Sequence, residues 1–154
     1  MTLDHDEPGP AMHLAQVNIA RARFDFNAPE MADFMRGVDL VNGVADRSPG
    51  LVWRLDDPSG GMNQGPHPRD IVNLSVWTDA KALSDFLRNT VHRHFVQHKH
   101  NWFLPPDKAH VVMWSVNPGT RPTLAEGLAR LAALRVSRAD QGVHVLQGSD
   151  QTRE

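Results

Sequence analysis

The stretch IVNLSVW, residues 71–77, decides the fold. Its residues alternate between two sets, with Val72, Leu74 and Val76 on one side and Asn73, Ser75 and Trp77 on the other. A period of two is typical of a β-strand whose two faces meet different surroundings. Thr78 and Asp79 follow directly, and residues of these types cap helices. The stretch therefore predicts a strand that leads straight into a helix.

The sequence on either side predicts three further strands and three helices. We expect the strands over residues 13–20, 51–55 and 110–117. We expect the helices from Pro29 through 45, over 80–103, and over 123–136 behind Pro122, because Pro suits the first helical position and apolar residues recur there with a period of about 3.6. Residues 56–70, rich in Gly and Pro, predict a loop or hairpin tip, and residues 143–147 predict a last extended piece.

This order of elements predicts an α+β fold of the ferredoxin-like, split βαβ type. In that fold an antiparallel sheet carries helices on one face, so its other face needs a cover. A second copy of the sheet is the usual cover, which predicts a symmetric homodimer. We expect one domain over residues 13–147, a disordered leader over 1–12 that is acidic and contains Pro and Gly, and a polar tail over 148–154.

Composition excludes several classes of function. The net charge of −2 argues against a nucleic-acid-binding protein, and no run of about 18 apolar residues is present that would cross a membrane. The acidic start of the chain does not resemble a secretion signal, which predicts a cytoplasmic protein. The chain has no Cys and no Tyr, which excludes thiolate chemistry, disulfides and acid chemistry at a phenol side chain.

Four histidines fall within TVHRHFVQHKHNWF, residues 90–103. His94 and His98 stand four apart on one helix face and can share a metal ion, but a third ligand and an HExxH motif are missing, so local packing and hydrogen bonding are the favoured interpretation. His92 falls on another side of the helix. A neutral imidazole there can act as acid or base near pH 7; the alternative is a bond to a loop carbonyl. His100 is expected to face solvent.

Five segments together are typical of one protein family: LAQVNIAR (14–21), MADFMRGVDLVNGVADRSPGLVWR (31–54), NLSVW (73–77), the helix end from His92 to Trp102-Phe103, and VMWSVNPGTRPTLAEGLARLAAL (112–134). Over residues 13–135 the chain resembles a bacterial and fungal family catalogued only as a domain of unknown function. That family is grouped with the dimeric α/β-barrel proteins, beside the antibiotic-biosynthesis monooxygenases. The resemblance therefore implies a dimeric α/β barrel.

The resemblance also suggests a function. It implies a monooxygenase-like enzyme that acts on an aromatic or polyketide-like metabolite without a tightly bound organic cofactor, with His92 as acid/base. Two alternatives stay open because relatives of the barrel include them. One is a haem-binding barrel, of the haem-dependent oxygenase or dehydratase type, with His92 as the iron ligand. The other is a cyclase, an isomerase or a non-catalytic ligand-binding accessory protein.

Large indoles beside neutral polar groups are typical of a pocket for an aromatic ligand. Trp53, Trp77 and Trp114 are expected to share a sheet face with Asn18, Asn73 and Ser75, and Trp102 stands at a helix end. The candidate substrate-binding residues are Asn18, Trp53, Arg54, Asn73, Trp77, Trp102 and Trp114. For the indoles the alternative is that they fill the core. For Arg54, and for Arg21, it is an ion pair with Asp39 or Asp46.

Overall fold

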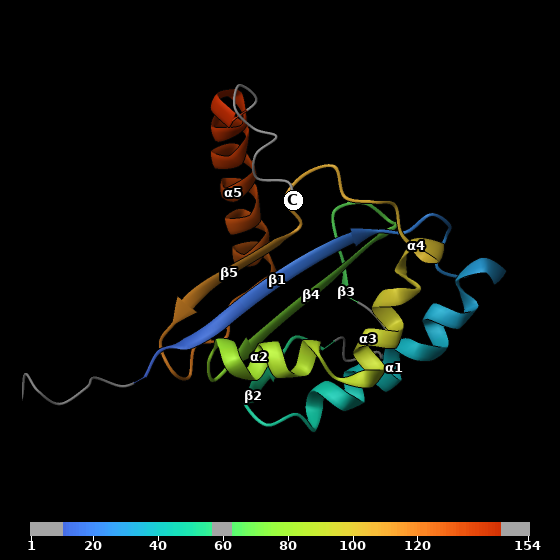
Figure 1. Ribbon diagram of the computed structural model, residues 1–154, viewed down its shortest axis with the longest axis horizontal. Coiled ribbons are helices and arrows are strands. Elements are labelled where there is room, and N and C mark those ends of the chain that lie inside the picture. Colours follow the sequence, from blue (N-terminus) through green and yellow to red (C-terminus); the bar gives the residue numbers. More distant parts are fainter. Residues whose placement is uncertain (1–10, 57–62, 146–154) are drawn as a thin grey trace, which may run out of the picture.

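The computed structural model describes residues 11–56 and 63–145 of the 154 (Figure 1). The strands are β1 (His13–Arg21), β2 (Leu51–Arg54), β3 (Asn63–Gln64), β4 (Asp70–Trp77) and β5 (Val111–Val116). The helices are a 3-10 turn (Pro29–Met31), α1 (Ala32–Asp46), α2 (Ala80–Leu87), α3 (Thr90–Gln97), α4 (Lys99–Trp102) and α5 (Leu124–Val145). The expected tail, and all but residues 11–12 of the expected leader, lie outside the described residues.

The strands form one antiparallel sheet in the order β2-β4-β1-β5, and the short β3 also pairs with β4. The four strands expected from alternation are confirmed to within a residue or two at each end. In the central pair Gln16 lies opposite Ser75, Val17 opposite Leu74 and Asn18 opposite Asn73. One face of this pair is therefore apolar and the other polar.

Helices cover both faces of the sheet (Figure 1). Helices α1 to α4 lie on the polar face, as the ferredoxin-like pattern predicts. Helix α5 packs on the apolar face, where Leu131 joins a core with Val17, Leu74 and Val76. A Cβ added to Gly127 would lie 3.4 Å from Val17, so α5 and β1 are in close contact. The α+β class is confirmed, and α5 is an addition to the one-sided arrangement.

An aromatic cluster fastens α1 to α3 and α4. Phe34 is buried at its centre, with ring centroids 5.0 Å from Phe103, 5.4 Å from Phe95 and 5.6 Å from Trp102. Such tilted and edge-to-face pairs add to the free energy of burial. This cluster lies beside the end of the sheet at Ala22 and fixes the distance between the helices and the strands.

The single helix expected over residues 80–103 is wrong, because the structure breaks it into α2, α3 and α4. Asn89 has an extended backbone, and its side-chain oxygen accepts a hydrogen bond from the Val91 N–H at 2.9 Å. The chain therefore starts a new capped helix at Thr90. Neither Gly nor Pro marks this break, and the apolar period continues across it, so the pattern predicts one helix.

The extended segment expected over residues 143–147 is also wrong for the three of these residues that the structure describes. Residues 143–145 are the end of α5, and residues 146–147 are not described. Gly142 within the helix costs about 1 kcal/mol relative to Ala, which does not stop a long helix. The described part of the chain has no helix that is long and apolar enough to cross a membrane. A cytoplasmic location stays a prediction.

Two glycines with nearly equal φ angles allow a matched test of how closely the turn before β2 packs on α2. Gly50 has φ +89° and Gly119 has φ +91°. A Cβ at Gly50 would lie 2.4 Å from the Ala82 Cβ, whereas one at Gly119 would meet nothing within 4 Å. We expect Gly119→Ala to lower the free energy of unfolding by about 1–2 kcal/mol, the cost of a left-handed residue. Gly50→Ala should cost about 2–4 kcal/mol, because overpacking is added. Urea denaturation of both variants measures the difference, and equal costs would contradict this packing.

Candidate functional site

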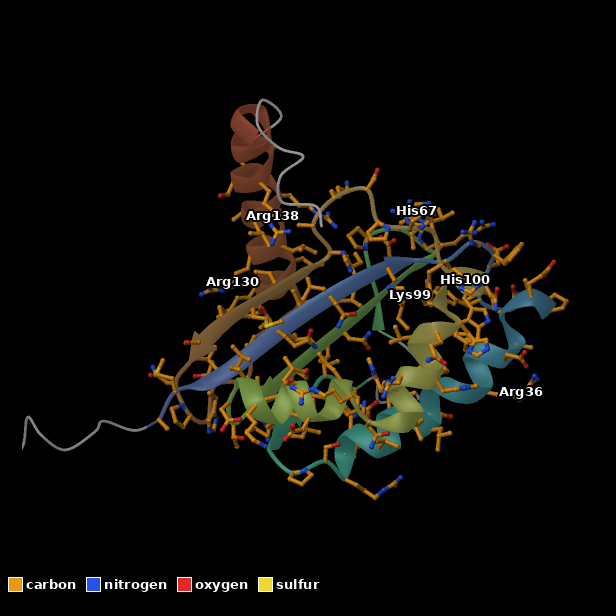
Figure 2. The ribbon with its side chains drawn as sticks, viewed as in Figure 1. Arg36, His67, Lys99, His100, Arg130 and Arg138 are labelled. Atoms are coloured by element: carbon orange, nitrogen blue, oxygen red, sulfur yellow. The ribbon has the colours of Figure 1, made fainter. Side chains whose placement is uncertain are left out.

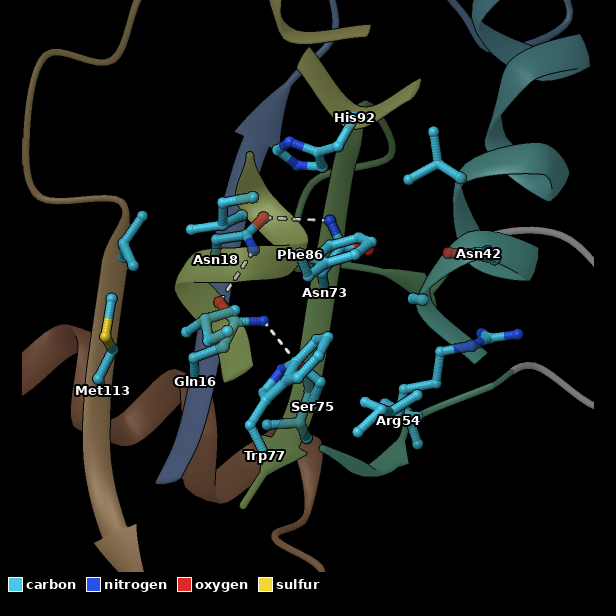
Figure 3. Close-up of a pocket in the computed structure, with 18 of the residues that line it drawn as sticks. Gln16, Asn18, Asn42, Arg54, Asn73, Ser75, Trp77, Phe86, His92 and Met113 are labelled. Carbon is cyan, nitrogen blue, oxygen red and sulfur yellow. Dashed lines mark hydrogen bonds between the residues drawn. The ribbon is translucent and has the colours of Figure 1, made fainter. Parts of the chain in front are cut away.

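A cavity of about 200 Å³ lies between the polar face of the sheet and helices α1 to α3 (Figure 3). Its floor consists of the side chains Gln16, Asn18, Asn73 and Ser75. Its walls are mostly apolar: Val38, Val41 and Ala45 from α1, Leu51 and Leu55 from the β2 region, Leu83, Phe86 and Leu87 from α2, and Val111 and Met113 from β5. Asn73 and Met113 are exposed, so the cavity reaches solvent there.

The floor is a continuous chain of hydrogen bonds, which we call the polar chain. The Trp77 Nε1–H and the Gln16 Nε2–H both donate to Ser75 Oγ at 2.9 Å. Asn18 Nδ2 donates to Gln16 Oε1, and Asn73 Nδ2 donates to Asn18 Oδ1, both at 3.1 Å. None of these groups ionises near neutral pH. The floor is therefore polar but uncharged.

His92 lies in the first turn of α3 and faces this cavity (Figure 3). Its ring packs against Phe86 at 5.0 Å between centroids, and Phe86 stacks on Trp77 at 5.2 Å. Its Nδ1 is buried and makes no hydrogen bond within the described structure. Burial lowers the pKa of His92, and the Leu87 backbone carbonyl acts in the opposite direction. The imidazole is therefore neutral at pH 7 and has a ring nitrogen free to take a proton.

Arg54 lines the cavity but already has a counter-charge. Its Nε and Nη2 donate to the two carboxylate oxygens of Asp46 at 2.6 and 3.0 Å, and Asp56 lies 3.4 Å away. The Arg54 guanidinium holds the pKa of Asp46 below its ordinary value. The ion pair expected as the alternative role of Arg54 is thus present. Arg21 pairs with Asp70 at 2.5 Å instead of with Asp39 or Asp46.

Only one of the four tryptophans lines the cavity. Trp77 does so, but Trp53 and Trp114 belong to the apolar cluster beneath α5, and Trp102 is buried in the aromatic cluster around Phe34. The expectation that Trp53, Trp77 and Trp114 share one face is wrong. Trp114 lies opposite Ala15, on the apolar face. In β2 the register shifts between Leu51 and Trp53, and Trp53 packs against the same apolar cluster. Alternation within one strand does not fix the register between strands.

The other three histidines of this helical segment, His94, His98 and His100, are not part of the cavity lining. His98 Nδ1 lies 2.9 Å from the His94 carbonyl oxygen, and the two rings are 4.6 Å apart. This local arrangement is the one that the sequence favours for the pair. Among the described residues no group of three or more His, Asp or Glu side chains is placed to hold a metal ion. His100, labelled in Figure 2, is exposed, as expected.

Besides the aliphatic part of the lining, the sequence does not single out four cavity residues: Gln16, Asn42, Phe86 and Met113. Gln16 carried a usable signal, because it alternates with Val17 beside Asn18 in a strand. Asn42 carried a weaker one, as a polar residue between Val38 and Ala45 on the buried side of α1. Phe86 and Met113 carried none, since their patterns fit ordinary core positions.

Comparison with known proteins gives a family and a fold. Residues 13–142 match the family described as "Domain of unknown function (DUF3291)". None of the curated proteins matches the chain. Solved structures with similar folds include SnoaB, a cofactor-independent oxygenase from Streptomyces nogalater, with TM-score 0.50 and 20% identity over 75% of this chain and 100% of that one.

Two further structures are similar to a comparable degree. A Nitrosomonas europaea protein, named as a candidate antibiotic-biosynthesis monooxygenase, has TM-score 0.52 and 14% identity over 75% of this chain and 99% of that one. A conserved protein from Methanosarcina mazei has TM-score 0.51 and 15% identity over 68% of this chain and 92% of that one. At these identities the likeness shows the fold alone.

The burial of His92 predicts how the free energy of unfolding depends on pH. Its pKa in the folded protein lies below the value of about 6.5 expected in the unfolded chain. The unfolded chain therefore binds more protons as the pH falls through 6.5, and acidification destabilises the fold. We expect the free energy of unfolding of the wild type to fall more than that of His92→Gln between about pH 7 and about pH 5.5, as measured by urea denaturation. Parallel pH profiles would show that His92 ionises freely in the fold.

Proposed function

The chain belongs to the DUF3291 family, and from its cavity we propose that the protein is a small-molecule enzyme of the monooxygenase-like class. The substrate is an aromatic or polyketide-like metabolite, no tightly bound organic cofactor takes part, and His92 is the acid/base. One observation carries the proposal: a neutral His92 with a free ring nitrogen shares a cavity with an aromatic wall and an uncharged polar floor.

The size of the cavity supports a small aromatic substrate. A cavity of about 150 Å³ holds a benzene ring, and drug-sized ligands need about 300–1,000 Å³. At about 200 Å³ this cavity takes one substituted ring. A larger polyketide-like molecule would extend past Met113, out of the cavity of this chain. Of the tryptophans proposed to bind substrate we retain Trp77, as a ring surface, because its N–H is already bonded to Ser75.

The chemistry needs a base and a place for negative charge. His92 would take the proton of a phenol or enol hydroxyl, and the carboxamides of Asn18 and Asn73, which line the same cavity, would donate hydrogen bonds to the resulting oxygen anion. The electron-rich anion then reduces dioxygen itself. In balanced form, a ring CH₂ group and O₂ give a ring carbonyl and water, so that one oxygen atom enters the product and the substrate supplies all four electrons. The described activity of SnoaB supports this class of reaction.

Haem fits the cavity poorly. A porphyrin is at least as large as the drug-sized ligands whose pockets span about 300–1,000 Å³, and this cavity measures about 200 Å³. The His92 ring is also packed against Phe86. Haem would therefore require α1 to α3 to move away from the sheet, so we derive no step through it.

The proposal is tested with a hydroxyanthrone, whose ring CH₂ becomes a carbonyl on oxidation. We expect the protein to accelerate oxygen uptake and quinone formation, and His92→Ala to lower kcat by about 10²–10⁴-fold, the usual contribution of a general base. His94→Ala is the matched control, because His94 is exposed on the same helix and lies outside the cavity. It should keep wild-type turnover. Full turnover by His92→Ala would remove His92 from the mechanism.

Two further readouts separate the alternatives. A Soret band in protein purified from haem-supplied cells, with turnover that depends on it, would favour the haem-binding barrel over our proposal. Binding of the hydroxyanthrone without turnover would favour an accessory binding protein. Whether hydroxyanthrone is oxidised or only bound, it should raise the melting temperature of the protein, because a ligand that binds the native state stabilises it.

We retain the homodimer as part of the proposal. The second half of α5 extends beyond the sheet (Figure 1), and Val136 on it is 64% exposed. β5 is an edge strand, and Met113 on it is 50% exposed. Apolar side chains at an edge strand and on a projecting helix are typical of a surface covered by a second copy. We expect sedimentation equilibrium of the full chain to give twice the chain mass, and a monomer at high protein concentration would contradict the barrel architecture.

A further inference from the structure

The polar chain has one fixed end and one open end. Trp77 N–H can only donate, so its bond to Ser75 Oγ has one possible direction. Asn73, at the other end, is exposed at the cavity mouth. The Ser75 hydroxyl and the two carboxamides of Gln16 and Asn18 lie between these ends, with successive groups 2.9–3.1 Å apart. Figure 3 shows this row running from Trp77 toward His92.

Each carboxamide can turn over with little change in shape, because its oxygen and nitrogen differ in role more than in size. In the direction recorded here, Ser75 Oγ accepts from both Trp77 and Gln16. Within the described residues its own hydrogen then has no acceptor. With all three carboxamides turned, Ser75 donates to Gln16, Gln16 to Asn18, and Asn18 to Asn73. The number of bonds is kept, and the buried hydroxyl hydrogen gains a partner.

The two directions present different groups to the ligand. In the recorded direction one N–H of Asn73 Nδ2 bonds Asn18, and the Oδ1 end of the carboxamide faces away from Asn18, where it can accept a bond. In the turned direction Oδ1 bonds Asn18, and the NH2 end takes that outer position and can donate. A neutral phenol hydroxyl, which donates, fits the first direction. A phenolate or enolate oxygen, which only accepts, fits the second.

We propose that Gln16 and Ser75 are positioning residues, which make the polar chain a two-state hydrogen-bond relay that turns Asn73 from acceptor to donor when the ligand loses its proton. The inference rests on the proposed function, since it assumes a ligand with an ionisable hydroxyl, and it narrows the substrate class to phenols and enols. The hydroxyl hydrogen first turns from Asn73 Oδ1 to a His92 ring nitrogen, and as the ligand O–H bond breaks its proton passes to that nitrogen. The relay then supplies an N–H to the new anion, and each bond in the chain strengthens the next.

The side chains around the relay are suited to this role. Gln16 is 7% exposed and Ser75 8%, so an unpaired polar atom in either is costly and the chain turns as a unit. Carboxamide torsions at Gln and Asn are broad and roughly two-fold, which allows the turn without moving the backbone. The described lining includes no carboxylate that would repel an anion. Asp46, which lies near Arg54, is outside the lining and is hydrogen-bonded to that arginine.

The test uses 4-nitrophenol, a one-ring phenol whose anion is yellow. Absorbance titrations on either side of its own pKa give separate dissociation constants for the neutral and anionic forms. We expect the wild type to bind the anion about tenfold more tightly than the neutral form, a shift of about one pKa unit in the bound phenol. Ser75→Ala and Gln16→Met should each lose most of that preference. Ser75→Thr, which keeps the hydroxyl, should retain it.

The outcomes distinguish failure of the relay from failure of the proposed function. Ser115→Ala, on an exposed strand serine outside the cavity, is the control and should behave as wild type. Gln16→Met and Ser75→Ala lie on different strands, so the test survives if one variant fails to fold. If both fold, bind the probe and keep the tenfold preference, the relay is wrong. If the wild type binds neither form of the probe, the relay and the proposed function both fall. If the preference behaves as expected but hydroxyanthrone is not oxidised, the proposed function falls and the relay stands.

Discussion

The antiparallel register of β1 against β4 is the constraint on which the rest of the structure depends. Because Val17 lies opposite Leu74 and Gln16 opposite Ser75, the two strands have one apolar face and one polar face. A slip by one residue would turn every side chain to the other face. The apolar face receives α5, and the polar face becomes the cavity floor. The same pairing therefore determines both the core and the site.

The break between α2 and α3 is the second constraint, because it determines where His92 lies. On an uninterrupted helix Phe86 and His92 would point about 120° apart, because six residues at about 100° each turn through 600°. The new helix that starts behind Asn89 brings both rings to one cavity, 5.0 Å apart. The aromatic cluster around Phe34 then holds α3 against α1. His92 faces the polar floor because of this break, and the family resemblance alone does not explain it.

These two features show what the sequence could and could not predict. Alternation in IVNLSVW separates Ser75 and Asn73 from Leu74, and periodicity finds α1, because both signals are local. The position of Trp114 depends on how β5 pairs with β1, and that register is a property of two distant segments. The helix break depends on one hydrogen bond that the Asn89 side chain accepts from the Val91 N–H, and the apolar period continues across the break. The sequence therefore predicts which face of its own strand or helix a residue occupies, but not a position that depends on pairing with a distant segment.

Charge balance in the cavity links the ionisation of a ligand to that of His92. Besides His92, the one titratable side chain in the described lining is Arg54, which Asp46 already compensates. A proton that His92 takes from solvent creates a buried cation without a counter-charge, and that is why burial lowers its pKa. A proton taken from a ligand hydroxyl creates an anion beside the cation, so the pair stays neutral. The cavity thus favours proton transfer from ligand to His92 over protonation of His92 by solvent. Phenols and enols still carry a hydroxyl proton to transfer near neutral pH, whereas carboxylic acids have already lost theirs.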